Sequence, residues 1–139
     1  MNNFISLTDL PDFDEALALA KSLKKDPFTF EQHAKRKTLG LLFFNPSLRT
    51  RLSTQKAALN LGMEPIVMNF GSEGWQLEFE DGTLMDQGKS EHIKEAAQVI
   101  SQYCDVIAIR AFAGLQDKEK DEAEEVLESF KKYATVPIL

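Results

Sequence analysis

An α/β fold is predicted for this 139-residue chain, with three layers in which helices flank a central, mainly parallel sheet. Two apolar runs, at 39–44 and 105–109, have the composition of strands that are buried on both faces, as parallel strands are. Segments with helical periodicity separate these runs, and a strand–helix–strand unit of this length pairs its strands in parallel. The length of the chain suits a single domain.

The stretch 39–62 contains the clearest strand–helix unit of the sequence. Asn45 and Pro46 end the strand, because proline lacks an N–H group and holds the residue before it extended. Ser47 then stands at the N-cap position of a helix, and Gly62 stands where a C′ glycine would end it. The spacing places three leucines on one face of this helix, namely Leu48, Leu52 and Leu59.

The first turn of this helix carries hydroxyl and guanidinium groups, from Ser47, Arg49, Thr50 and Arg51. Backbone N–H groups and the positive end of the helix dipole converge there, and guanidinium forks match the geometry of phosphate. The alternative is an ordinary capped helix whose arginines lie in solvent. Because two arginines occupy a first turn where acidic residues are normally preferred, the pattern favours an anion-binding site.

The run Phe43–Arg51, with the sequence FFNPSLRTR, resembles the carbamoyl-phosphate signature of the transcarbamylases, whose usual form is Ser-Thr-Arg-Thr-Arg. Leu48 departs from that form. Asn45-Pro46 and the later Gly74-Trp75-Gln76 resemble the N-acylornithine branch, which contains the N-acetylornithine and N-succinylornithine transcarbamylases. The resemblance covers essentially the whole chain. It implies that residues 1–139 form the carbamoyl-phosphate-binding domain, with the acceptor-binding domain absent from this chain.

The resemblance implies carbamoyl transfer from carbamoyl phosphate to the δ-amine of an N-acylornithine in arginine biosynthesis. Of the two possible acceptors, we expect N-succinylornithine slightly more than N-acetylornithine. The chain alone is expected to be inactive, and neither a metal nor an organic cofactor is implied. The residues that the resemblance assigns to carbamoyl phosphate are Ser47, Leu48, Arg49, Thr50, Trp75 and Arg110, of which Arg49, Thr50 and Arg110 are expected to be catalytic.

The assignment of Arg110 is also supported by its place in the sequence, whereas that of Trp75 depends on the resemblance alone. Arg110 follows the apolar run 105–109, and ligands of open α/β sheets bind beyond the carboxyl ends of strands. The alternative for Arg110 is a surface arginine paired with an acidic neighbour. Trp75 on its own would suggest packing in a core or hinge. The resemblance instead implies that Trp75 reaches the carbamoyl-phosphate site of a neighbouring subunit, so that the protein is a homotrimer.

Lys89 and Ser90 fall where transcarbamylases place the loop that closes over the acceptor substrate. The resemblance leads us to expect proline at position 90 for succinyl acceptors and glutamate for acetyl acceptors, and Ser90 matches neither. From the residues alone, Ser90 suits the N-cap of a helix and Glu91 suits its first turn.

The remaining elements follow from periodicity and turn residues. We expect a helix that Asp12 or Asp9 caps and that Asp26-Pro27 ends, with an apolar stripe formed by Phe13, Leu17, Ala20 and Leu23. We expect strands at 63–70, 76–79 and from 135 onward, and a helix at 92–103 with an exposed His92 and a buried Cys104 after it. A helix at 117–133 should turn these residues inward: Ala123, Val126, Leu127 and Phe130.

Composition narrows the class of partner. The net charge of −6 argues against general binding of nucleic acid. No signal-peptide pattern and no membrane-spanning apolar run occur, and a single cysteine fits a reducing cytoplasm. His33 has no second ligand spaced nearby for a metal. Two other functions stay open: an ornithine or aspartate transcarbamylase, and a non-catalytic module for phosphate binding or oligomerisation. A kinase is disfavoured, because the sequence contains no phosphate-binding G-x-x-x-x-G-K-[ST] loop.

Overall fold

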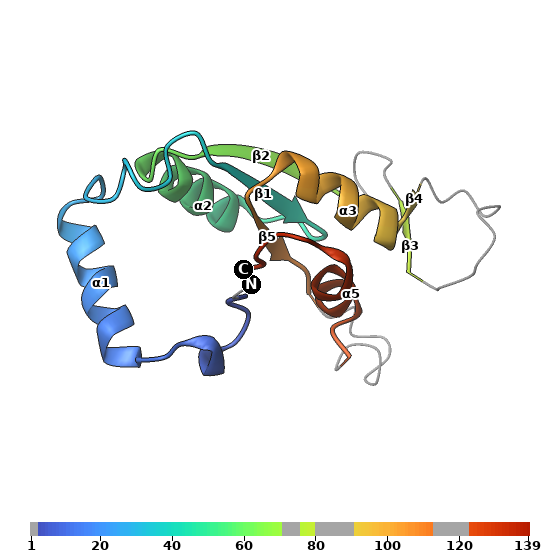
Figure 1. Cartoon of the computed structure of the whole chain (residues 1–139), viewed down its shortest axis with the longest axis horizontal. Coiled ribbons are helices and arrows are strands. Elements are labelled where there is room, and N and C mark those ends of the chain that lie inside the picture. The colour runs from blue at the N-terminus through green and yellow to red at the C-terminus, as the bar shows by residue number, and fades with distance from the viewer. Residues whose placement is uncertain (1–2, 71–75, 80–90, 113–122) are drawn as a thin grey trace.

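The computed structural model describes residues 3–70, 76–79, 91–112 and 123–139 (Figure 1). Its centre is a parallel sheet in the order β2-β1-β5, formed by Glu64–Asn69, Thr38–Phe43 and Val106–Arg110. The helix α2 (Leu48–Asn60) packs on one face of this sheet. The helices α3 (Ile93–Tyr103) and α5 (Glu125–Tyr133) pack on the other face. The predicted three-layer α/β fold is therefore confirmed.

The central strand β1 is buried on both faces because its side chains alternate between two apolar cores. Leu39, Leu41 and Phe43 pack in one core with Ala58 of α2. Leu42 packs in the other core with residues of α3 and α5, and it is fully buried. This alternation explains why the sequence of β1 is almost continuously apolar rather than amphipathic.

The carboxyl end of the chain adds a further parallel pairing at the outer edge of β5, as the apolar residues after 135 predict. Ile138 forms a bridge with Ile107, and the Leu139 N–H donates to the Ile107 carbonyl at 2.9 Å. On its other side the Ile138 carbonyl accepts from the Phe4 N–H at 2.8 Å. The first described residues of the chain therefore lie beside its last residues.

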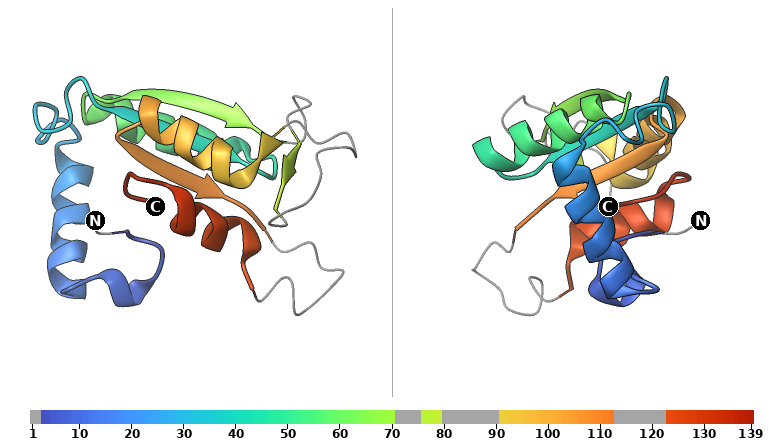
Figure 2. Two further views of the ribbon diagram at one scale, coloured as in Figure 1. Left: turned by 45° about the vertical axis from the view of Figure 1, so that its right-hand side comes forward. Right: turned by 90° about the vertical axis from the view of Figure 1, so that its left-hand side faces the viewer.

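The helix α1 (Phe13–Lys25) has the predicted cap but not the expected packing. The Asp12 side chain accepts from the Glu15 N–H at 3.0 Å, while Asp9 belongs to a preceding 3-10 helix, η1 (Leu7–Asp9). No residue of α1 is buried, and Phe13 and Leu17 are exposed. Figures 1 and 2 show α1 standing apart from the three layers. Most of its apolar stripe is thus exposed, and only Leu23 of the four residues is partly buried.

The helix α2 starts and ends where the sequence predicts. Ser47 is its N-cap, and Gly62, just beyond it, has a φ of +79°. A Cβ at Gly62 would also lie 2.4 Å from the Glu31 carbonyl oxygen, so glycine is required there twice over. The three leucines of the predicted apolar face are exposed, however: Leu48, Leu52 and Leu59. The sheet instead receives the small side chain of Ala58, because this helix packs closely on the sheet.

Three expectations at the other helices are wrong. The N-cap of α3 is His92, whose Nδ1 accepts from the Lys94 N–H at 3.0 Å, and this role leaves the His92 side chain only 14% exposed. Glu91 belongs to a short strand rather than to the first turn of α3, since β4 (Glu91–His92) pairs in parallel with β3 (Leu77–Glu78). The helix α5 begins only at Glu125, after a left-handed Glu124, which leaves Ala123 exposed.

Gly40 of β1 allows α3 and its end to approach the sheet. A Cβ at Gly40 would lie 2.8 Å from Cys104 Sγ, too close for an unshifted structure. We therefore expect Gly40→Ala to lower the free energy of unfolding by about 1–3 kcal/mol. Cys104→Ala removes the obstructing sulfur, so the double variant should recover part of that loss, measured by urea denaturation. Strictly additive losses would contradict this account.

Asp105 joins the amino ends of β1 and β5. Its carboxylate accepts from Lys37 Nζ at 2.7 Å and from the Thr38 N–H at 2.8 Å. These hydrogen bonds, that of Lys37 first, lower the pKa of Asp105 in the folded chain. Its stabilising contribution is therefore present above the unfolded pKa of about 4 and is lost as the pH falls through the lower folded pKa.

Asp105→Asn should accordingly lower the free energy of unfolding at pH 7. The difference in free energy of unfolding between the variant and the parent, its stability deficit, should shrink as the pH falls below about 4. Urea denaturation at a series of pH values measures this deficit. Glu31→Gln is the control, because Glu31 is exposed and should change stability by less than about 0.5 kcal/mol. A deficit that is the same at pH 7 and pH 3 would contradict the prediction.

Candidate functional site

The turn between β1 and α2 leaves the sheet as the sequence predicts. Sheet pairing continues one residue beyond β1, where the Phe44 N–H donates to the Arg110 carbonyl at 2.9 Å. Asn45 and Pro46 follow, and Ser47 then adopts an extended conformation as the N-cap of α2. Ser47 Oγ accepts from the Thr50 N–H at 3.3 Å. One of the free donors of the helix terminus is thereby satisfied.

Two further backbone donors of this terminus remain available. In the part of the chain that the structure describes, nothing accepts from the N–H groups of Leu48 and Arg49. The first turn contains no acidic side chain. The dipole of a thirteen-residue helix therefore adds its positive end to two free donors, an arrangement that favours an anion.

A cavity of about 560 Å³ opens at this turn. Residues 43–48 line it, together with Arg51, Asn69 and Phe70. The rings of Phe44 and Phe70 stack with their centroids 4.8 Å apart. Polar groups of the turn thus meet an aromatic pair at the carboxyl ends of β1 and β2.

Arg110 reaches the same turn from the end of β5. Its Nη1 donates to the carbonyl oxygens of Asn45 and Pro46, at 2.9 and 2.8 Å. Its guanidinium carbon lies 4.1 Å from the ring centroid of Phe112. No acidic side chain among the described residues pairs with it, so the alternative of a surface ion pair is not what the structure has. Its position at a strand end predicts this approach to the turn.

Of the three residues Arg49, Thr50 and Arg51 in the first turn of α2, only Arg51 lines the cavity. Arg49 is exposed, and no hydrogen bond or ion pair joins its side chain to another described residue. Neither Arg49 nor the half-buried Thr50 lines the cavity. Arg51 does line it, and its Nη1 donates to Asn69 Oδ1 at 3.3 Å. Arg51 therefore ties α2 to the end of β2, while the roles of Arg49 and Thr50 stay predictions.

Sequence reasoning missed two asparagines at this edge of the sheet. Asn45 Oδ1 accepts from the Phe112 N–H at 2.7 Å, and Asn69 is the last residue of β2. Their position could have identified them as site residues, because both are polar and lie at the carboxyl end of a parallel strand. Trp75, Lys89 and Ser90 lie outside the described residues.

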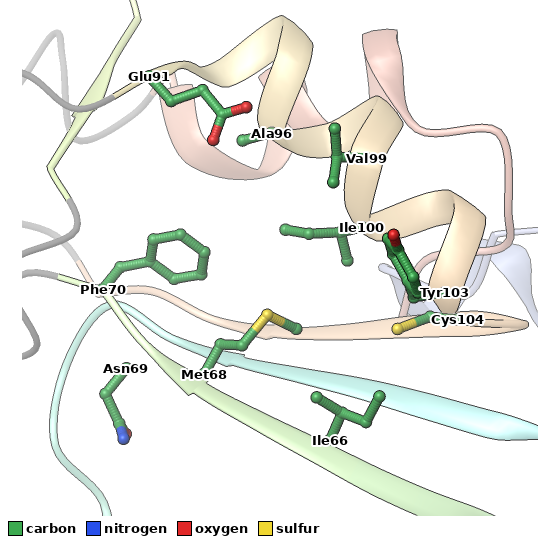
Figure 3. Close-up of a pocket in the computed structure, with 10 residues that line it drawn as sticks. All are labelled: Ile66, Met68, Asn69, Phe70, Glu91, Ala96, Val99, Ile100, Tyr103 and Cys104. Atoms are coloured by element: carbon green, nitrogen blue, oxygen red, sulfur yellow. The ribbon is translucent and has the colours of Figure 1, made fainter.

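A second cavity, of about 410 Å³, lies between β2 and α3 (Figure 3). Apolar side chains such as Met68, Val99 and Ile100 line it, and the carboxylate of Glu91 stands at one end. Cys104 also borders it, and burial followed by the negative charge of Asp105 raises the pKa of this thiol. No positively charged side chain is among the residues that line this second cavity, so it suits an anion less well than the turn before α2 does.

Neither a metal-binding cluster nor a membrane-spanning helix occurs among the described residues. Within the described ranges, no three residues of the types histidine, cysteine, aspartate and glutamate gather to hold a metal ion. His33 is exposed and meets the edge of the Phe30 ring, with centroids 5.3 Å apart. None of the helices in these ranges is long and apolar enough to cross a membrane.

A parallel sheet whose strand-to-helix turn gathers free N–H donors and guanidinium groups defines a phosphate-binding α/β domain. Residues 2–139 match the family profile described as "Aspartate/ornithine carbamoyltransferase, carbamoyl-P binding domain". The chain therefore belongs to the aspartate/ornithine carbamoyltransferase family, as the carbamoyl-phosphate motif predicts.

Several similar proteins within the family carry the names of N-acylornithine enzymes. Over 138 residues the chain is 45% identical to N-succinylornithine carbamoyltransferase of Bacteroides thetaiotaomicron, covering 99% of this chain and 43% of that protein. It is 41% identical to N-acetylornithine carbamoyltransferase of Xanthomonas campestris pv. campestris, covering 92% of this chain and 37% of the relative. The chain thus spans less than half the length of these relatives.

A solved structure has the same fold. A mutant of N-acetyl-L-ornithine transcarbamylase complexed with carbamyl phosphate and N-succinyl-L-norvaline superposes with a TM-score of 0.91 at 39% identity. The match covers 99% of this chain and 42% of that one. The described fold is therefore that of one part of such an enzyme.

Ser47 allows the capping role to be separated from an anion-binding role. Ser47→Asp should keep the free energy of unfolding within about 0.5 kcal/mol of the parent, because aspartate caps as well as serine, whereas Ser47→Ala should lose about 1 kcal/mol. The new carboxylate should nevertheless abolish binding of inorganic phosphate at this terminus, which calorimetry measures. Unchanged phosphate affinity in Ser47→Asp would show that the anion binds elsewhere.

Proposed function

We propose that residues 1–139 bind carbamoyl phosphate and supply the carbamoyl-phosphate half of an N-acylornithine carbamoyltransferase. Such an enzyme transfers the carbamoyl group to the δ-amine of its acceptor, with release of phosphate, as a step of arginine biosynthesis. The observation that carries the proposal is the donor-rich turn at the N-terminus of α2, which Arg110 approaches from the end of β5. Membership of the carbamoyltransferase family supports it.

Electrostatic stabilisation is the main task of the proposed site. The phosphate group binds at the N-terminus of α2, where the N–H groups of Leu48 and Arg49 are free and the Ser47 hydroxyl adds a polar contact. The guanidinium groups of Arg49 and Arg110 and the Thr50 hydroxyl stabilise the negative charge that develops on the carbonyl oxygen and on the leaving phosphate. The neutral acceptor amine must then be held against the carbamoyl carbon. As the C–N bond forms and the C–O bond to phosphate breaks, the amine loses a proton that the released phosphate takes up, without a metal or an organic cofactor.

The proposed acceptor is N-succinylornithine, in preference to N-acetylornithine. The N-succinylornithine enzyme of Bacteroides thetaiotaomicron shares 45% identity with this chain, against 41% for the N-acetylornithine enzyme of Xanthomonas campestris. In the solved relative that holds N-succinyl-L-norvaline, a serine replaces a glutamate. This chain likewise carries a serine, and not a glutamate, at position 90, the residue that the resemblance connects with the acyl group.

Assembly and location belong to the same proposal. The protein acts as a cytoplasmic homotrimer in which Trp75 reaches the carbamoyl-phosphate site of a neighbouring subunit, and the acceptor binds through a domain outside residues 1–139. The family resemblance of Gly74-Trp75-Gln76 supports the role of the tryptophan. The single cysteine, buried and unpaired, suits a reducing compartment.

Arg49→Ala tests the proposed site most directly. Because Arg49 is exposed and its side chain contacts no described partner, the variant should unfold at the same urea concentration as the parent. Its affinity for carbamoyl phosphate should fall by at least about 100-fold, because a charge-assisted bidentate contact to phosphate is lost. Isothermal titration calorimetry measures the affinity.

Lys56→Ala is the matched control, since it removes a positive charge from the same helix two turns further along. It should leave the affinity for carbamoyl phosphate within about twofold of the parent, because an exposed charge at that distance is largely screened. Equal affinity in Arg49→Ala and the parent would refute the assignment of Arg49. Failure of the parent itself to bind carbamoyl phosphate would refute the proposed function of the chain.

A further inference from the structure

The exits of β1 and β5 are joined beyond the last regular sheet pairing. The Phe44 N–H donates to the Arg110 carbonyl at 2.9 Å, and the Phe112 N–H donates to Asn45 Oδ1 at 2.7 Å. The second bond uses a side chain where the ladder would use a backbone carbonyl. Asn45 therefore keeps the segment after β5 against the turn after β1, although Pro46 has already ended the strand.

The guanidinium of Arg110 is held between these two segments. Its Nη1 donates to the Asn45 and Pro46 carbonyls, and its carbon lies 4.1 Å from the ring centroid of Phe112. A guanidinium carries five N–H donors, and both of these bonds use Nη1. Since no described group accepts from Nε or Nη2, that edge of the fork is available for two oxygens of an anion.

The chemistry of Asn45 suits this arrangement. Its amide oxygen accepts a hydrogen bond without carrying charge. An aspartate could accept the same bond from Phe112, but its carboxylate would stand beside the Arg110 guanidinium and would repel a doubly charged phosphate. A neutral acceptor at position 45 therefore holds the Phe112 segment in place and leaves the positive charge of Arg110 for the ligand.

We propose that Asn45 is a positioning residue for Arg110: its side-chain oxygen holds Phe112, whose ring then keeps the guanidinium in place with one edge open to the anion. This inference rests on the proposed carbamoyl-phosphate site. In this proposal Asn45 acts through Arg110 and is given no direct role on the reacting atoms. Its removal should therefore change the behaviour of the Arg110 guanidinium even when no ligand is present.

The first experiment reads that behaviour directly by ¹⁵N NMR of the arginine side chains in the ligand-free chain. A guanidinium held through Nη1 rotates slowly about its Nε–Cζ bond, the rotation that exchanges the two Nη nitrogens. The parent should therefore give separate Nη1 and Nη2 signals for Arg110, assigned by their absence in Arg110→Lys. In Asn45→Ala the two signals should merge into one. Separate signals in Asn45→Ala, or merged signals already in the parent, would overturn the proposal.

The second experiment is a double-mutant cycle on carbamoyl phosphate affinity, measured by calorimetry on the full chain. Asn45→Ala should weaken binding about tenfold, the effect of one disturbed hydrogen bond from a charged group. In an Arg110→Ala background the same change should have no effect, because Asn45 acts only through Arg110. Equal, independent losses in both backgrounds would show that Asn45 acts through general stability and would refute the inference.

Phe112→Leu gives a second route if Asn45→Ala does not fold. Phe112 is 66% exposed and keeps its backbone bond to Asn45 in this variant, so folding should be preserved. The proposal requires the Nη signals of Arg110 to merge here as well, and unchanged signals would overturn it. A parent that shows separate Nη signals but does not bind carbamoyl phosphate would refute the proposed function alone.

Discussion

The burial of β1 on both faces and its hydrogen bonding on both edges constrain the rest of the molecule. Parallel neighbours cover its two edges, and α2 on one side and α3 with α5 on the other cover its faces. The chain can leave such a strand only at its end, which it does at Asn45-Pro46. The N-terminus of α2 is therefore placed at the edge where β2 and β5 also end.

This placement gives a locally positive site to a chain whose net charge is −6. Two of its guanidinium groups are tied to neutral oxygens, Arg51 to Asn69 and Arg110 to the carbonyls of the turn. Neutral partners hold a guanidinium without cancelling its charge, as a carboxylate would. The site therefore keeps its positive potential while its side chains are already oriented.

Local chemistry explains which elements the sequence predicts and which it does not. The ends of α2 were predictable, because the Ser47 cap and the left-handed Gly62 act within a few residues of themselves. The extent of α3 was predicted too, but its capping residue was not, because His92 serves as the N-cap while also pairing with β3. Periodicity likewise identified the leucines on α2 but could not say which face of the helix meets the sheet.

The sequence by itself determined the layered α/β fold, the capped turn and the absence of acidic residues beside Arg49 and Arg51 in the first turn of α2, since these depend on the apolar pattern and on neighbours along the chain. Only the tertiary structure decided that Arg110 rests on the Asn45 and Pro46 carbonyls and that Asn45 holds Phe112. More than sixty residues separate these partners in sequence. The physical reason is that parallel pairing brings the carboxyl ends of β1 and β5 together, while the register of that pairing is set by packing on both faces of the sheet.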